Sequence, residues 1–287
     1  MVVLGKVMAT SQTQQDEGIL VPSFTFRKAE EFYGDRVDEA LAAVEAGRDG
    51  VGYDVVFMPG LVDSRIGAPK EARVWQEWFS APSVRLTGRT KQGSRVVVHG
   101  HVPNYLSKSE NVTTVIGAGL RNGAGLVPQG ELDRLVALED GESVFVTDYA
   151  AWQKAPQSGT LIGVDDAVGH PETIPFLGGR SRAERYLPRH QEVFGNRVRV
   201  YHADDLDEQG PRGRVLALGY VDSDDLSGDV NLYDFARFVG VRRLGAPQAH
   251  ASAQRGPTIE AMLRVSADFV PKAAREAFEQ QVRSLYK

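Results

Sequence analysis

Two β-rich runs, Ser83–Thr90 and Ser94–His99, are separated only by Lys91-Gln92-Gly93. A connection this short, ending in glycine, is typical of a β-hairpin. Parallel neighbours need a crossover of a dozen or more residues, so these two strands must pair antiparallel. The chain is therefore not expected to fold as a purely parallel, doubly wound sheet.

Strand-like and helix-like segments alternate along most of the 287 residues. Apolar spacing predicts helices at 28–46, 69–80, 129–138, 182–194 and 271–286. Short apolar runs predict further strands at 20–27, 53–58, 112–116, 143–147, 173–177, 197–201 and 214–221. We therefore expect an α/β or α+β fold, in which a mixed sheet with at least one antiparallel hairpin is flanked by helices and followed by a C-terminal helix.

One stretch near the C-terminus, Ala246–Pro257 (APQAHASAQRGP), resembles a linker. It lies too close to that terminus to separate two large domains. We expect residues 1–245 to form a mixed α/β domain and residues 246–257 a linker-like loop. Residues 258–287 then form a C-terminal extension whose helix packs on the domain.

The composition excludes several classes of protein. The chain has no cysteine, so it has no disulfide, thiolate nucleophile or cysteine-ligated metal. Its net charge is −5 and its charges are interspersed, which argues against nucleic acid as a partner. It contains neither a secretory leader pattern nor an apolar run of ~18 residues. We expect a soluble, cytoplasmic protein without a membrane partner, and a homo-oligomer is compatible with the sequence.

The segment Val112–Leu126 (VTTVIGAGLRNGAGL) is rich in glycine. A predicted strand runs into it and a predicted helix follows, and glycines at such a junction let backbone N–H groups approach an anion. Asp148, at the end of a later predicted strand, could accept hydrogen bonds from a ribose. The anion-binding hypothesis uses Gly117, Gly119, Arg121, Gly123 and Gly125. The alternative is a surface loop whose glycines simply permit positive φ.

A second glycine-rich junction lies at Gly178-Gly-Arg180-Ser-Arg182, between a predicted strand and a predicted helix. Backbone amides and arginine side chains again come together, as an anion site requires. The alternative is a solvated helix face with ion pairs. Two such junctions favour a small anionic ligand, such as a nucleotide or another phosphorylated or carboxylated molecule.

Histidines follow two predicted strands. His99 and His101 leave the strand of the hairpin, and His202 and Asp204 follow the strand at 197–201. Imidazole and carboxylate groups at adjacent strand ends suit a general acid–base pair or a divalent metal. The alternative is that these residues cap turns. His170, His190 and His250 resemble surface or turn residues.

The acidic stretch Asp222–Asn231 (DSDDLSGDVN) is similar to a calcium-binding loop in its spacing. Its closing position falls on Asp234 or Phe235 where that loop has glutamate. We therefore interpret this stretch as an ordinary Asp/Ser/Gly turn.

Three functions are consistent with these patterns. In the first, a soluble enzyme or ligand-binding protein takes a small anionic molecule, and His99, His101, Asp148, His202 and Asp204 transfer protons. In the second, the two histidine-containing strand ends form a metal-dependent hydrolase. In the third, the chain is a non-catalytic oligomeric assembly or binding protein. The sequence does not decide whether the chain is an enzyme, and it leaves the cofactor open between a divalent metal and a nucleotide.

Overall fold

The computed structural model describes residues 29–48, 50–219 and 225–243. The chain divides into two units, Met1–Gly245 and Ala246–Lys287, and the described residues belong to the first. The predicted strand at 20–27, the linker-like loop at 246–257 and the helix at 271–286 lie outside the described residues. The C-terminal extension at 258–287 therefore stays a prediction.

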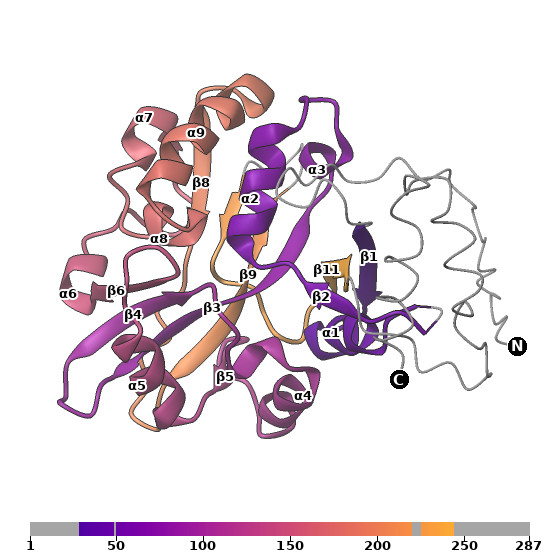
Figure 1. Cartoon of the computed structure of the whole chain (residues 1–287). Helices are drawn as coiled ribbons and strands as arrows, with labels where there is room; N and C mark the ends of the chain where they lie inside the picture. Colours follow the sequence, from indigo (N-terminus) through magenta and orange to yellow (C-terminus); the bar gives the residue numbers. More distant parts are fainter. Residues whose placement is uncertain (1–28, 49, 220–224, 244–287) are drawn as a thin grey trace, which may run out of the picture. The chain divides into compact units, whose positions relative to one another are not determined.

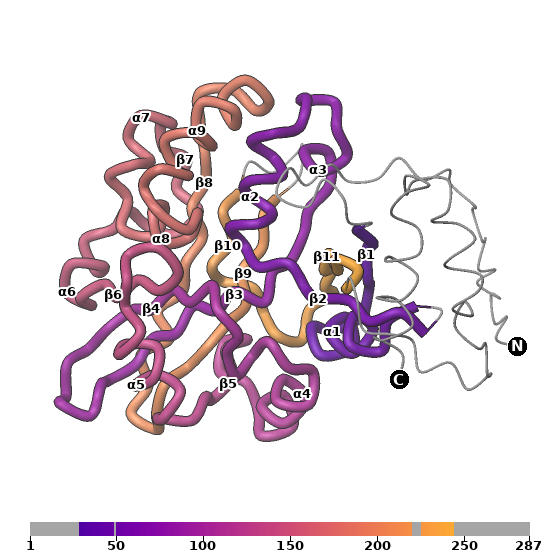
Figure 2. The backbone as a smooth tube through the Cα atoms, viewed as in Figure 1, coloured from indigo at the N-terminus to yellow at the C-terminus, as the bar shows by residue number. Residues whose placement is uncertain are grey.

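One mixed sheet contains all the strands of the described part (Figure 1). The strands are β1 (Ala29–Gly34), β2 (Tyr53–Val55), β3 (Phe79–Arg89), β4 (Arg95–Gly100), β5 (Gly125–Leu126), β6 (Val144–Asp148), β7 (Leu161–Gly163), β8 (Arg197–Tyr201), β9 (Arg212–Leu218), β10 (Asp225–Ser227) and β11 (Ala236–Arg242). Their main order is β1-β11-β3-β9-β10-β8-β7, with β2 on β11, β4 and then β6 on β3, and β5 on β9. Most pairs are antiparallel, whereas β10 runs parallel to β8 and β11 runs parallel to β3. Figure 2 shows β10 beside β8 and β9.

Strand β3 is long because it serves two parts of the sheet. Its first residues lie between β11 and β9, and its later residues lie between β4 and β9. The register with β9 shifts between Ala81 and Val84, where Pro82 lacks the N–H that a ladder needs. The Ser83 hydroxyl fixes this bulge, because it accepts a 2.8 Å hydrogen bond from the Met58 backbone N–H.

Helices cover both faces of the sheet (Figure 1). They are α1 (Val37–Ala46), α2 (Met58–Gly67), α3 (Arg73–Gln76), the 3-10 turn η2 (Tyr105–Ser107), α4 (Ser109–Gly117), α5 (Gln129–Ala137), α6 (Tyr149–Trp152), α7 (Val164–Ala167), α8 (Thr173–Leu177) and α9 (Arg180–Phe194). We call face A the side on which α2, α8 and α9 pack, and face B the side on which α1, α4 and α5 pack. Within the described residues, no helix is long and apolar enough to cross a membrane.

Alternation along the strands assigns side chains to the two faces. On β9, Leu216 and Leu218 join the apolar core of face A, whereas Val215 joins that of face B. Strand β11 divides in the same way, with Val239 on face A and Phe238 on face B. Both faces are therefore buried against helices over much of the sheet.

The structure confirms the mixed α/β class and the antiparallel hairpin, which is β3 with β4. It also confirms the helices predicted at 129–138 and 182–194 and the strands at 143–147, 197–201 and 214–221, with small shifts of their ends. The strand at 53–58 is shorter than predicted, because α2 begins at Met58.

Four predicted elements are wrong in whole or in part. Residues 29–34 form strand β1 instead of the start of a helix, because they pair along their length with β11. Residues 112–116 are helical, with Val112 and Val115 buried on one side and Thr113 and Thr114 bonded to carbonyls four residues earlier. Residues 173–177 form the short helix α8. Within 69–80 only Arg73–Gln76 is α-helical, and Phe79 already begins β3.

Candidate binding site

A cavity of about 350 Å³ opens above three neighbouring strands. Its floor is formed by Ser80 of β3, Ala217 of β9 and Ser227 of β10, which lie opposite one another in the ladder. These three residues follow the alternation of face B. Because their side chains are small, they leave a hollow over the sheet where larger residues would fill it.

Aromatic rings form one wall of this cavity. Trp78, just before β3, packs edge-to-face against Phe235, with ring centroids 5.3 Å apart. The ring of Phe235 also packs near that of Tyr33 of β1, with ring centroids 6.2 Å apart. The large apolar side chains that are exposed in the described part include Phe235 (47%), which lines the cavity, and its neighbour Tyr33 (43%). Exposed aromatic side chains gathered beside a cavity are typical of a binding surface.

Carboxylates form the other wall. Asp225, Asp229 and Asp234 line the cavity, and its described lining contains no lysine or arginine. Burial raises the pKa of Asp229, and the nearby Arg214 only partly offsets this effect. Asp225 lies 3.9 Å from Arg199. The cavity therefore carries an excess of negative charge.

The loop between β10 and β11 is anchored through its backbone. The buried Arg214 of β9 donates to the carbonyl of Asp229 at 2.9 Å and is itself held by both carboxylate oxygens of Asp205, at 2.7 and 2.8 Å. The Leu232 N–H donates to the carbonyl of Gly123 at 3.0 Å, and the Leu232 side chain is buried in the core of face B. The exposed side chains of the loop are therefore not the groups that hold it in place.

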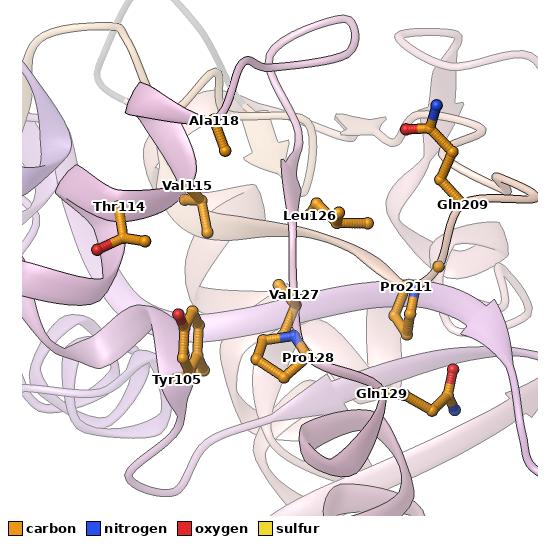
Figure 3. Close-up of a pocket in the computed structure, with 11 residues that line it drawn as sticks. Tyr105, Thr114, Val115, Ala118, Leu126, Val127, Pro128, Gln129, Gln209 and Pro211 are labelled. Carbon is orange, nitrogen blue, oxygen red and sulfur yellow. The ribbon is translucent and has the colours of Figure 1, made fainter.

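A second hollow of about 360 Å³ lies between α4, β5 and the residues before β9 (Figure 3). Val115, Leu126 and Pro211 form its apolar wall, and Gln129 and Gln209 lie at its edge. Its described lining contains neither a charged side chain nor an exposed aromatic cluster. The cavity above β3, β9 and β10 is the better candidate site.

His99 lies in a buried polar network on face A. Its Nε2 atom is 2.7 Å from Glu172, which also binds Arg85 at 2.8 Å and accepts a hydrogen bond from the Trp152 indole. Burial would raise the pKa of Glu172, but Arg85 and His99 outweigh it and hold this pKa well below its usual range. The His99 side chain is 1% exposed, so a substrate cannot reach it.

His101 is also buried, and both of its ring nitrogens are used. Nε2 lies 2.7 Å from the carbonyl of Pro175 and Nδ1 lies 2.9 Å from the Ser83 hydroxyl. Since a carbonyl only accepts, Nε2 carries the proton and Nδ1 accepts from Ser83. Burial lowers the pKa of His101 to about 3. Its neutral ring joins β4, the bulge of β3 and α8.

The remaining predicted proton-transfer residues lie apart from the cavity. His202 Nε2 is 3.1 Å from the carbonyl of Pro156, and its ring packs against Trp152. Asp204 accepts from the Tyr149 hydroxyl at 2.7 Å. Asp148 caps helix α6, accepting from the Ala151 N–H at 3.0 Å. These contacts are the turn-capping and structural roles that the sequence left as an alternative.

The structure does bring part of the two histidine clusters together. Glu172 contacts both His99 and Trp152, and the Trp152 ring lies 5.2 Å from that of His202. His170, which packs on His202, is buried but lies in a turn, as one of the two predicted settings has it, whereas His190 is buried within α9, so the prediction of a surface or turn position is wrong for His190. Among the described residues, no group of three or more His, Asp or Glu side chains is arranged to hold a metal ion.

The glycine-rich loop has a different structural context from the predicted one. Helix α4 ends at Gly117 and strand β5 contains Gly125, so the helix precedes the loop and offers no N-terminus to an anion. Gly119 and Gly123 have φ of 97° and 86°. Arg121 lies 3.2 Å from Asp207. The predicted strand–glycine–helix order is therefore wrong at this loop.

The second glycine-rich junction joins two helices. Gly178 and Gly179, with φ of 75° and 116°, separate α8 from α9. Arg182 pairs with Asp63 of α2 at 3.1 Å, and Arg180 is exposed at the start of α9. The predicted strand before the glycines is wrong. The anion-binding role of both arginines stays a prediction.

The residues that line the cavity were missed as a site. The composition of the acidic stretch predicts an ordinary turn, and Trp78 falls in a segment whose apolar spacing predicts a helix. Two signals are present in the sequence: the aromatic residues Tyr233 and Phe235 lie within four residues of the end of the acidic stretch, and they flank a further acid, Asp234. Exposed aromatic residues in a polar loop are a stronger indication of binding than buried ones.

One solved structure is similar to this chain across the whole of its own length. It belongs to work on the accommodation of massive sequence variation in Nanoarchaeota by the C-type lectin fold. The two chains are 42% identical and superpose with a TM-score of 0.69, and the match covers 76% of this chain and 100% of the other. No family model matches the sequence, and no curated protein matches it.

The architecture is thus a C-type lectin fold with an open, aromatic and acidic cavity above β3, β9 and β10. At 42% identity over the full length of the other chain, the likeness extends beyond the fold. This chain belongs to the C-type lectin-fold family that the nanoarchaeal structure represents.

Proposed function

We propose that this chain is a non-catalytic binding protein whose ligand contacts the cavity and the exposed side chains of residues 229–235. One observation carries this proposal: Arg214, Gly123 and the buried Leu232 hold the loop without using those exposed side chains. A loop anchored in this way can change its binding residues without losing its backbone conformation. We therefore propose that the loop tolerates sequence variation.

The family supports this proposal. The related nanoarchaeal structure was described for its accommodation of massive sequence variation, and this chain has the same fold. The predicted third function, a non-catalytic binding protein, fits these observations better than an enzyme does. His99 and His101 are buried, which removes the main support for proton transfer to a substrate. Self-association stays a prediction.

The anionic ligand predicted from the sequence has less support at this site. Asp225, Asp229 and Asp234 would repel an anion in the cavity. Arg121 and Arg182 each lie beside a carboxylate of the chain, so their charge is already partly compensated. A ligand that presents positive or hydrogen-bond-donating groups suits the cavity better.

A display library tests this proposal. The exposed residues Tyr233, Asp234 and Phe235 are randomised together, and the library is selected for protease resistance and then for binding to unrelated target proteins. We expect most members to stay folded and some to acquire new binding, because the backbone of the loop is anchored through Arg214, Gly123 and Leu232.

The matched control library randomises three buried positions of the same region: Leu232, Ala236 and Phe238. We expect few of its members to resist protease, since these positions belong to or pack on the core of face B. Equal survival in the two libraries would contradict the proposed anchoring. Failure to select any binder from the first library, when its members fold, would contradict the proposed binding function.

A further inference from the structure

We propose that the cavity above β3, β9 and β10 binds the guanidinium group of an arginine side chain presented by a partner protein. This inference rests on the proposed function and names the chemistry of the bound group. It combines the shape of the cavity, its aromatic wall and its charge.

The size and lining of the cavity fit a flat cation on a flexible stem. A volume of about 350 Å³ holds one long side chain but not a folded element. Trp78 and Phe235 offer ring surfaces, on which a guanidinium stacks better than an ammonium does. The three aspartates offer carboxylate oxygens, which match the fork of guanidinium N–H donors.

The chain itself shows this chemistry beside the cavity. The guanidinium of Arg237 in β11 lies 4.9 Å from the ring of Tyr33 and 5.8 Å from that of Trp78. It also pairs with Glu77 at 2.7 Å. Aromatic rings and a carboxylate therefore already hold one guanidinium on one side of Trp78. The cavity repeats the same combination of groups, but no cation of the described chain lies in its lining.

The electrostatics of the cavity agree with a positive occupant. Burial raises the pKa of Asp229 by more than the nearby Arg214, Arg85 and His202 lower it. Arg199 reaches Asp225 from the neighbouring strand β8, and Asp234 is exposed at the rim. A guanidinium between Asp229 and Asp234 would add a positive charge to a lining that contains carboxylates and, among the described residues, no lysine or arginine.

The test uses two short peptides with the full chain. The probe is acetyl-Gly-Arg-Gly-amide, and the neutral isostere acetyl-Gly-citrulline-Gly-amide is its control. Binding is followed through the indole N–H signal of Trp78 in ¹H–¹⁵N spectra, assigned with Trp78→Phe. Trp75 and Trp152 are buried and serve as internal references.

We expect the arginine peptide to shift the Trp78 signal in a saturable way and the citrulline peptide to bind at least tenfold more weakly. Asp234→Asn should lower the affinity for the arginine peptide several-fold, and the double variant Asp229→Asn/Asp234→Asn should lower this affinity further. Asp165→Asn, which removes an exposed carboxylate of α7, should leave binding unchanged.

Equal binding of the two peptides, or an unchanged affinity in the double variant, would overturn the proposed guanidinium site. Failure of both peptides to shift Trp78 would also overturn it. If the library of loop variants still gave binders in that case, the proposed binding function would stand. A library without binders would instead remove the proposed function itself.

Discussion

Glu172 is the residue on which several buried groups of face A depend. Its carboxylate pairs with Arg85 through two guanidinium nitrogens, with His99 and with the Trp152 indole. Arg85 is fully buried, and its next nearest carboxylate, Asp205, is 3.7 Å away. Loss of the Glu172 charge would therefore leave a buried cation with little compensation.

Glu172→Gln is expected to lower the free energy of unfolding by about 3–5 kcal/mol, the usual effect of breaking a buried ion pair. Glu208→Gln is the matched control, because Glu208 pairs with Arg89 of the same strand at the same 2.8 Å but lies in solvent. Its effect should be small. Denaturant unfolding measures both, and equal losses would show that burial of the first pair is unimportant.

His101 makes stability depend on pH. Its pKa is about 3 in the folded protein, whereas the ordinary value is 6.5, so the unfolded chain binds the proton more readily between these values. The contribution of the neutral His101 to the free energy of unfolding is fully present above pH 6.5 and is lost as the pH falls toward 3. This loss begins above the range in which Glu172 would be protonated in the unfolded chain.

Between pH 6.5 and 5, His101 should account for a loss of about 2 kcal/mol, since one pKa unit corresponds to about 1.4 kcal/mol. His101→Gln keeps a hydrogen-bonding side chain without a titrating group. The variant should be less stable at pH 7 but should lose less stability on acidification to pH 5. Chemical denaturation at both pH values measures this, and an unchanged pH dependence would argue against the assignment.

At the scale of elements, two loops depend on each other. The glycine-rich loop between α4 and β5 packs on the loop between β10 and β11, through the Leu232 N–H to Gly123 and the Arg214 guanidinium to Asn122. A Cβ at Gly123 would lie 3.0 Å from the Cα of Asn231. The glycine at this position therefore serves the close approach of the two loops.

A comparison of Gly123→Ala with Gly119→Ala distinguishes the cost of crowding between the two loops from the cost of backbone strain. Both glycines have positive φ, 86° and 97°, but a Cβ at Gly119 meets nothing within 4 Å. Gly119→Ala should cost about 1 kcal/mol, from strain alone. Gly123→Ala should cost more and should speed hydrogen exchange of the Leu232 amide. Equal costs and equal exchange rates would mean that the two loops do not support each other.

At the scale of the whole molecule, β3 organises both cores and the cavity. Its first residues bring β11 beside β9 and supply Ser80 to the cavity floor. After the bulge at Pro82, its later residues carry Arg85 into the polar network of face A and Leu86 into the core of face B. One long strand thus links the candidate binding site to the most buried charges of the protein.

Local patterns predicted much of the fold and little of the site. The helix at 129–137 and the strand at 144–148 are encoded by residues close together in the chain. Strand β1 was predicted as part of a helix, because its partner β11 lies about two hundred residues later. The cavity was missed for the same reason, since Trp78 and Phe235 meet only after β3 and β11 pair.

The sequence by itself determined the β3–β4 hairpin, because a three-residue connection with glycine leaves two apolar runs no other pairing. It also determined the absence of any cysteine chemistry. Only the tertiary structure decided that Arg85 and His99 are buried, because an alternating strand pattern does not say which face a helix will cover. It also decided where the binding surface lies, since three small residues and two aromatic rings become one cavity only through the register of distant strands.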